Sequence, residues 1–211
     1  MSSWLQKLEH NTFNEKAKEH IWNMFDNHMD NTFDLFHVKA YPQPIAQVKL
    51  AFVRSLCRLL ESMLTFEMPL HSFHVDKQKK VMTRAFTYAF AWTFGGSIDS
   101  RCHSSFEVYL GNAFQSTQNE IPRTSIFDNC LYLKAPGTKD MTLEYQLWDT
   151  MLPHISAEDD QKSMSEKETR YEIVVPTKDT VRYSWLLKMN LISGRPVFLT
   201  GVSGVGKSII C

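Results

Sequence analysis

Eight residues near the end of the printed sequence have the types and spacing of a phosphate-binding loop. They match the pattern G-x-x-x-x-G-K-[ST] at every defined position, and they are Gly201, Val202, Ser203, Gly204, Val205, Gly206, Lys207 and Ser208. Glycines let successive backbone N–H groups turn toward phosphate oxygens, and a helix N-terminus adds its positive dipole end. The pattern predicts that Lys207 contacts β- and γ-phosphates and that the Ser208 hydroxyl ligates Mg²⁺. The alternative is a glycine-rich strand-to-helix turn that binds no ligand.

The elements around the loop would have to position it. Residues 196–200 have the composition of a short buried strand, and a helix is expected from Ser208 onward. Upstream, "YEIVVPT" predicts a strand that ends at a proline, and "KDTVRYSWLLKMNLISG" predicts a helix that stops at a glycine. Such a strand end can offer a flat apolar wall to a nucleotide base, made by Val174, Val175 and Pro176. An ordinary strand end explains the same spacing equally well.

The first half of the chain predicts helices. "NEKAKEHIWNMFDNHMDNTFDLF" has apolar residues near a 3.6-residue period, and Thr12 with Glu15 resembles a capping box. The apolar positions are Ile21, Met24, Phe25, Met29, Phe33 and Phe36. A second helix is expected from Pro44, with Pro69 marking its end. Its apolar stripe is Ile45, Val48, Phe52, Leu56, Leu59 and Met63.

A third helix, expected from Asp76, carries "KVMTRAFTYAFAWTFGG" and is apolar on nearly every face. Its aromatic residues suggest core packing in preference to a base-stacking platform, and they are Phe86, Tyr88, Phe90, Trp92 and Phe94. The pair Gly95-Gly96 predicts its end, and Asp99 or Ser100 is expected to cap a fourth helix through "CHSSFEVYLGNAF". The second half then offers "SIFDNCLYL" and "MTLEYQLW" as strands around a turn at residues 135–137. A mixed α/β fold is therefore expected.

Composition excludes several classes of function. Lys plus Arg and Asp plus Glu number 23 each, and this balance argues against a general nucleic-acid-binding or membrane-surface role. No apolar run reaches membrane-span length, and "MSSWLQKLEHNTF" lacks a signal-peptide core. The cysteines are scattered, which predicts a reducing, intracellular chain without disulfides or zinc; they are Cys57, Cys102, Cys130 and Cys211. His71 and His74 fit a solvated loop better than a metal site.

Several stretches together resemble the dynein heavy chain family. "IVVPTKDTVRYSWLL" followed by "RPVFLTGVSGVGKS" resembles the start of the third AAA+ module of these proteins. "FTYAFAWTFGGSID" is similar to the helical segment before that module, and "SWLQKL" and "LAFVRSLCRLLESML" are similar to the helical lid that ends the second module. The resemblance runs in order through most of the chain and is stronger to axonemal than to cytoplasmic heavy chains.

The resemblance implies a fold and a function. The fold would be an N-terminal helical lid subdomain over residues 1–115, followed over residues 116–211 by the truncated start of a P-loop AAA+ α/β domain. The parent would be an ATP-driven microtubule motor of the cilium or flagellum axoneme, in the cytoskeleton. Its partners would be other AAA+ modules of the same heavy chain, dynein intermediate and light chains, and microtubules.

The resemblance also assigns roles near the loop. Residues Val174 to Thr177 would line the adenine side of a regulatory site for ATP or ADP, with Lys207 and Ser208 at the phosphates and Mg²⁺. The chain is expected to be a fragment that lacks the hydrolysis machinery and is inactive alone. Two alternatives stay open: a helical adaptor protein with an incidental glycine loop, and another truncated P-loop NTPase.

Overall fold

The computed structural model describes residues 14–37, 41–65, 73–138, 140–152, 176–192, 194, 196–199, 203–204 and 206–210. The chain divides into two compact units, Met1–Gln146 and Leu147–Cys211, and each is described by itself. This division groups residues 116–146 with the helices of the first unit. A module boundary near residue 115 stays a prediction from the sequence.

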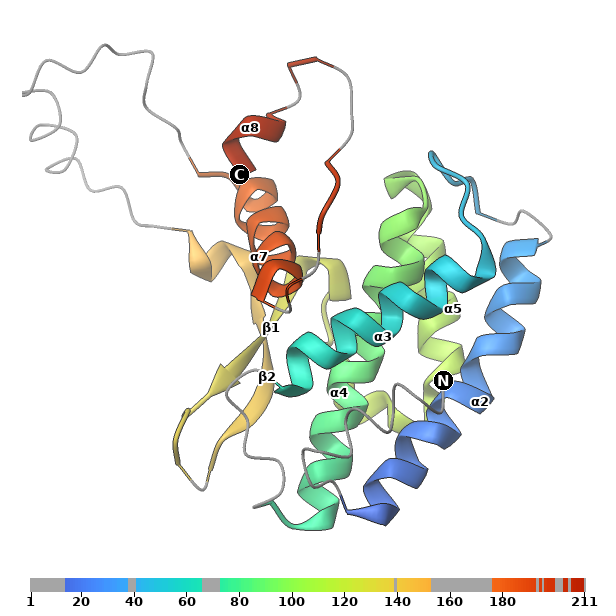
Figure 1. The fold of residues 1–211 in the computed structure, drawn as a ribbon, viewed down its shortest axis with the longest axis vertical. Coiled ribbons are helices and arrows are strands. Elements are labelled where there is room, and N and C mark those ends of the chain that lie inside the picture. Colours follow the sequence, from blue (N-terminus) through green and yellow to red (C-terminus); the bar gives the residue numbers. More distant parts are fainter. Residues whose placement is uncertain are drawn as a thin grey trace, which may run out of the picture. The chain divides into compact units, whose positions relative to one another are not determined.

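In its described residues the first unit is built on four α-helices: α2 (Glu15–His37), α3 (Lys49–Thr65), α4 (Val75–Phe94) and α5 (His103–Ala113). Helix α4 packs against both α2 and α3 (Figure 1). The stripe predicted for the first helix is confirmed, since all of its members are buried: Ile21, Met24, Phe25, Met29, Phe33 and Phe36. Thr12, the predicted cap of this helix, lies outside the described residues.

The start of α3 is a correction to the sequence prediction. The helix begins at Lys49 and not near Pro44, and residues 41–48 form an irregular segment. In a helix the N–H of Gln47 would donate to the carbonyl of residue 43; here it donates to the side-chain Oε1 of Gln43 at 3.2 Å. Ile45 and Val48 are consequently 58% and 69% exposed. The rest of the predicted stripe is buried: Phe52, Leu56, Leu59 and Met63.

Helix α4 forms the centre of the core, as its sequence predicts. The aromatic set is buried throughout: Phe86, Tyr88, Phe90, Trp92 and Phe94. The ring of Phe94 stacks on Phe52 of α3 with centroids 4.9 Å apart, and Phe86 meets Phe25 of α2 edge to face at 5.0 Å. These contacts explain why a helix with so few polar faces is stable in water: its neighbours cover nearly all of its surface.

Helix α4 ends at Phe94, next to the predicted glycine stop. Three-residue 3₁₀ helices follow, η2 (Gly95–Ser97) and η3 (Ser100–Cys102). The Asp99 side chain caps η3 by accepting from the N–H of Arg101 at 3.0 Å, so the predicted cap stands one short helix earlier than α5. The segment after α5 forms η4 (Gln115–Glu120) and η5 (Ile126–Asp128).

The predicted strand pair is confirmed with shorter limits. Strands β1 (Asn129–Lys134) and β2 (Thr142–Leu147) form a two-stranded sheet, while residues 126–128 belong to η5. The turn between them contains Ala135 and Gly137 with φ values of 50° and 77°. Arg84 of α4 ties this region to the helices: its Nε donates to Glu120 at 2.6 Å and its Nη1 donates to the Leu143 carbonyl at 2.5 Å.

The second unit contains η6 (Trp148–Met151), α7 (Lys178–Ile192) and α8 (Lys207–Ile210). Residues 196–199 form no strand, which corrects the predicted strand before the loop. A strand needs a hydrogen-bonded neighbour, and the one sheet in the described part of the chain pairs β1 with β2 only. The strand predicted over residues 171–175 lies outside the described residues. Within the described ranges, no helix has the length and apolar content needed to cross a membrane.

Candidate functional site

Helix α7 begins and ends as its sequence predicts. Thr177 and Thr180 cap its start reciprocally: the N–H of Thr177 donates to Oγ1 of Thr180 at 2.8 Å, and the N–H of Thr180 donates to Oγ1 of Thr177 at 3.2 Å. At the other end Gly194, with a φ of 64°, donates its N–H to the Leu191 carbonyl at 2.9 Å. The side chain of Thr177 is therefore engaged at the helix cap.

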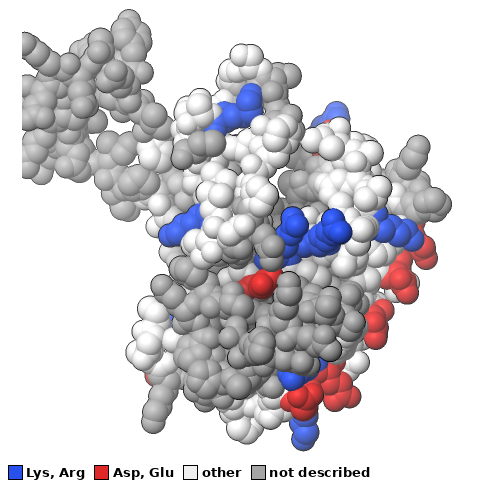
Figure 2. Space-filling model, in the orientation of Figure 1, with Lys and Arg blue, Asp and Glu red and all other residues white. Residues whose placement is uncertain are grey.

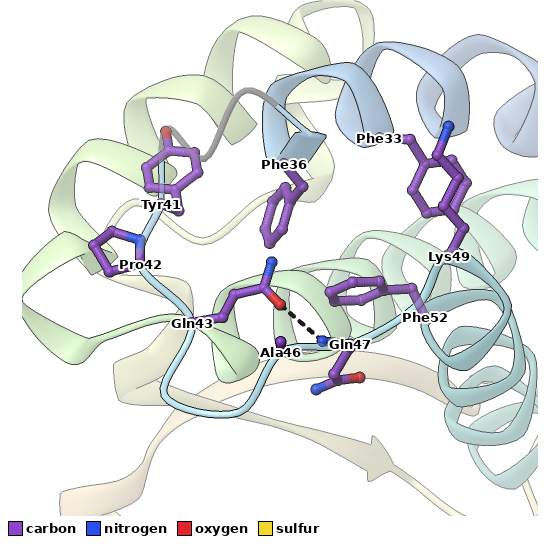
Figure 3. A pocket seen from close by; sticks show the side chains of 9 residues that line it. All are labelled: Phe33, Phe36, Tyr41, Pro42, Gln43, Ala46, Gln47, Lys49 and Phe52. Carbon is purple, nitrogen blue, oxygen red and sulfur yellow. Dashed lines mark hydrogen bonds between the residues drawn. The ribbon is translucent and has the colours of Figure 1, made fainter.

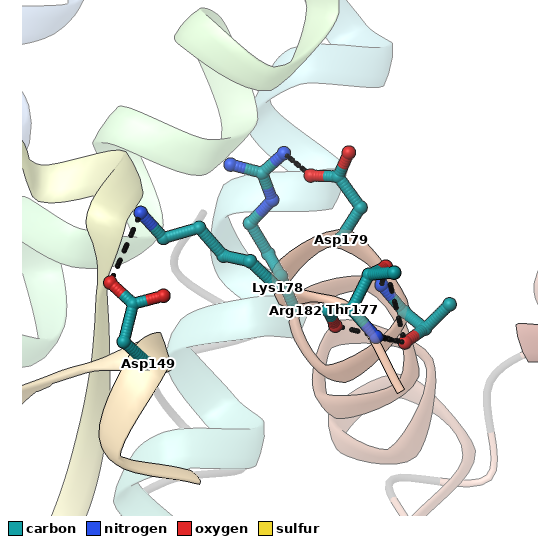
Figure 4. A network of polar contacts seen from close by, with 6 residues as sticks. Asp149, Thr177, Lys178, Asp179 and Arg182 are labelled. Carbon is teal, nitrogen blue, oxygen red and sulfur yellow. Dashed lines mark hydrogen bonds and ion pairs between the residues drawn. The ribbon is translucent and has the colours of Figure 1, made fainter. Parts of the chain in front are cut away.

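Charged and aromatic contacts hold α7 to η6 (Figure 4). Lys178 Nζ lies 3.5 Å from Asp149 Oδ2, and Arg182 pairs with Asp179 one turn earlier on α7. The Trp148 and Trp185 rings meet edge to face with centroids 5.8 Å apart. These contacts fix one face of α7 within the second unit.

The glycine loop leads into α8. Gly204 and Gly206 have φ values of 82° and 78°, a left-handed conformation that glycine adopts without steric cost. Helix α8 begins at Lys207, one residue before the predicted start, and the N–H of Ile209 donates to the Gly206 carbonyl at 3.1 Å. Gly201, Val202 and Val205 lie outside the described residues. The Ser208 side chain, the predicted Mg²⁺ ligand, belongs to an exposed residue at the start of this helix.

A shallow cavity lies between α7 and α8. Its volume is about 330 Å³, and its lining is Pro176, Thr180, Val181, Ser184 and Ile209. Pro176, predicted for the base wall, thus comes together with the helix that starts at the predicted phosphate lysine. Ser184 Oγ also donates to the Ile210 carbonyl at 3.4 Å, which links the two helices directly.

Of the residues predicted to line the adenine side, the structure describes Pro176 and Thr177. Pro176 lines the cavity, whereas Thr177 caps α7 and is not part of the lining; Val174 and Val175 lie outside the described residues. Their place beside a base stays a prediction. Sequence reasoning missed Thr180, Val181 and Ser184, although the spacing of four residues from Thr180 to Ser184 puts both hydroxyls on one helix face.

Metal ligands and reactive thiols do not gather in the described ranges. No group of three or more His, Cys, Asp or Glu side chains there has the geometry to hold a metal ion. His74 lies 3.3 Å from Asp76 on an exposed surface, and His71 is outside the described residues. Burial raises the pKa of the Cys57 and Cys130 thiols to about 11, so both are held as unreactive thiols at neutral pH.

Family comparisons agree with the order of these regions. The family described as dynein heavy chain AAA lid domain matches residues 21–179, and the family described as P-loop containing dynein motor region matches residues 162–211. The second match covers the glycine loop and α7. The first covers α2 from Ile21 onward, α3 to α5 and the strand pair.

Curated relatives match along nearly the whole chain. Human dynein axonemal heavy chain 6 is 24% identical over 219 residues, which cover 100% of this chain and 5% of the relative. Human dynein axonemal heavy chain 9 is 26% identical over 216 residues, covering 100% of this chain and 4% of the relative. Dynein axonemal heavy chain 11 of Sus scrofa is 25% identical over 213 residues, covering 99% and 4%.

The chain therefore spans 4% to 5% of the length of these three relatives. The helical first unit corresponds to lid sequence, and the glycine loop before α8 corresponds to P-loop motor-region sequence. Since the lid family matches residues 21–179, well over half of the chain, this protein belongs to the dynein heavy chain family.

Proposed function

We propose that the second unit carries the nucleotide site of a regulatory AAA+ module in an ATP-driven microtubule motor of the axoneme. The observation that carries this proposal is the cavity in which Pro176 and one face of α7 meet α8, the helix that starts at Lys207. An apolar wall beside the helix that follows a phosphate loop is the arrangement that a nucleotide needs: base on one side, phosphates on the other.

The ligand in this proposal is ATP or ADP with Mg²⁺. Lys207 would supply a positive charge to the β- and γ-phosphates, and the exposed Ser208 would offer its hydroxyl to the metal ion. The left-handed glycines on the N-terminal side of α8 support this assignment, because that backbone conformation turns N–H groups into an anion-binding concavity.

Helix α7 would hold the base. Its capped N-terminus and its contacts with η6 keep Thr180, Val181 and Ser184 on a fixed surface beside Pro176. Val181 and Pro176 offer apolar contact to a ring face. The Thr180 hydroxyl donates to the Thr177 carbonyl at 2.9 Å and accepts from the Thr177 N–H at 2.8 Å, so its hydrogen bonds serve the helix cap.

The wider setting of this proposal follows from the family. Partners would be other AAA+ modules of the same heavy chain, intermediate and light chains, and microtubules, and the place of action would be a cilium or flagellum. The names of the three relatives given above, each an axonemal heavy chain, support this setting. Assignment to the third module rests on the sequence resemblance.

The test is ATP binding by a heavy-chain segment that continues through the complete module. Lys207→Ala deletes a charge-assisted contact of about 1.5–3 kcal/mol and should weaken affinity by roughly tenfold to a hundredfold. Val202→Ala, a change at a variable position of the pattern, is the matched control and should bind like the parent. Calorimetry that finds the Lys207 variant binding ATP·Mg²⁺ as tightly as the control would reject the site.

A further inference from the structure

The segment that leads into α3 exposes an unusual number of large apolar side chains. Ile45, Val48 and Leu50 are 58%, 69% and 56% exposed, although they lie within six residues of one another. Single exposed apolar residues are ordinary on a protein surface, but a contiguous group indicates a binding surface. The helical period of the sequence placed Ile45 and Val48 in the core, and the first unit leaves them outside it.

A groove opens beside these residues (Figure 3). Its volume is about 460 Å³, within the usual range of roughly 300–1,000 Å³ for ligand pockets. The buried rings of Phe33, Phe36 and Phe52 contribute to its lining, together with Tyr41. Lys49 stands at its edge with Nζ 5.2 Å from the centroid of the Phe33 ring. The groove is therefore suited to an apolar side chain with a negative charge near its mouth.

Two arginines lie on the exposed face of α3, C-terminal to the groove. Leu50, Arg54 and Arg58 follow one another at four-residue steps on the exposed face, over about 12 Å of helix. Within the described ranges, neither Arg54 nor Arg58 forms an ion pair or a side-chain hydrogen bond. Basic side chains gather over α3 and acidic ones over α2 in Figure 2. The two arginines thus offer charge that nothing in the described chain neutralises.

We propose that this α3 surface, made of the groove, the apolar residues Ile45, Val48 and Leu50, and the arginines of α3, binds an acidic segment of another protein. An aromatic or aliphatic side chain of that segment would enter the groove, and carboxylates a few residues away would pair with Arg54 and Arg58. An extended peptide rises about 3.3 Å per residue, so a short spacer can separate the anchor from the carboxylates. The proposal is independent of the nucleotide site.

The apolar groove decides between this partner and other anions. Nucleic acid and anionic lipid headgroups are held chiefly by dense positive charge, whereas the chain has equal numbers of basic and acidic residues. A groove built from phenyl rings contributes little to a phosphate contact but contributes directly to burial of an apolar side chain. A segment that carries carboxylates beside an apolar side chain can contact both the groove and the arginines of α3.

A fluorescent peptide tests the proposal with the protein of residues 1–211. The probe carries a phenylalanine and a leucine followed, after two serines, by four glutamates. It should bind with an affinity that falls as salt is raised, because exposed ion pairs are screened. R54E/R58E should weaken binding at least tenfold. Ala46→Trp, at an exposed position that lines the groove, should do the same by filling it, and circular dichroism checks that both variants fold.

The matched control for charge is K16E/K188E, which changes the net charge equally at exposed lysines outside the α3 surface and should bind like the parent. A peptide with lysines in place of the glutamates should bind at least tenfold more weakly. Equal binding of the two peptides, or equal loss in the control variant, would overturn the proposal. So would tighter binding of single-stranded RNA or phosphatidylserine vesicles, or sedimentation showing that Arg54 and Arg58 hold two copies of this chain together.

Discussion

Substituting Gly95 by alanine should destabilise the first unit through a collision and not through the backbone. Gly95 has φ −69° and ψ −33°, an ordinary helical conformation in which alanine is favoured by about 0.5–1 kcal/mol. A Cβ at this position, however, would overlap Cζ of Phe127 and lie 2.9 Å from Cδ1 of Phe106. Phe127 cannot retreat freely, since it stacks on His103 at 4.1 Å and meets Trp92 edge to face at 5.3 Å.

The two effects oppose each other, and the collision is larger. Overpacking of a close-packed core costs about 1–3 kcal/mol, and the overlap with Phe127 puts this site in the upper half of that range. After the backbone gain is subtracted, the net loss in unfolding free energy should be about 1–2.5 kcal/mol. Gly96→Ala is the matched control, because its Cβ would lie 3.4 Å from the nearest atom, Cε3 of Trp92, on an exposed residue. Urea denaturation followed by circular dichroism and tryptophan fluorescence measures both. Equal unfolding free energies for the two variants would refute the reasoning.

Three further outcomes are expected. Burial holds the pKa of His20 and His28 below the usual 6.5, so the unfolded chain binds more protons than the folded chain in this range. The unfolding free energy should therefore fall as the pH drops below about 6.5, and an unfolding free energy that stays constant between about pH 7.5 and 5 would contradict this. Arg84→Ala should cost about 2 kcal/mol in urea denaturation, because it removes the donors to the Glu120 carboxylate and the Leu143 carbonyl and, of the described ion pairs, leaves Glu120 only the 3.6 Å contact with Lys80. Arg101→Ala, at an exposed pair, should leave the unfolding free energy nearly unchanged. The protein of residues 1–211 should release no phosphate from ATP above background, because α8 is a single helical turn, too short to hold the N–H groups of the loop in place. Phosphate release that depends on Lys207 would contradict this.

Much of the fold could be predicted because the information is local. The 3.6-residue period of α2 and the all-round apolar face of α4 identify both helices and their buried residues. The same period wrongly predicted a helix before Lys49, with Ile45 and Val48 buried. Apolar residues on a partner-binding surface and in a core can have the same spacing in the sequence. The strand predicted over residues 196–200 was wrong for another reason: a strand depends on a hydrogen-bonded neighbour, which its own sequence does not specify.

The candidate site was predictable only in part. The spacing of the loop identifies Lys207 and Ser208 as the chemistry-bearing pair, because phosphate chemistry fixes those residue types. The spacing from Thr180 to Ser184 puts both hydroxyls on one face of α7, but the local sequence does not show that this face meets α8. Thr177 is placed on the adenine side only by the family resemblance, and that role stays a prediction; the hydrogen bonds with Thr180 show that it caps α7.

Glycine is required in this chain for two different physical reasons, lack of space and a left-handed backbone, and the sequence does not distinguish them. Gly95 has room for a helical backbone but no room for a methyl group, so any side chain at this position collides with Phe106 and Phe127. Gly204 and Gly206 have φ near +80°, and the nearest atom to an added Cβ is 3.8 Å away at Gly206 and beyond 4 Å at Gly204. Alanine at the loop positions is therefore opposed by backbone conformation and not by crowding. A smaller side chain in place of Phe127 or Phe106 would make room for a Cβ at residue 95. The loop glycines, by contrast, can be replaced only if the backbone that leads into α8 changes its conformation.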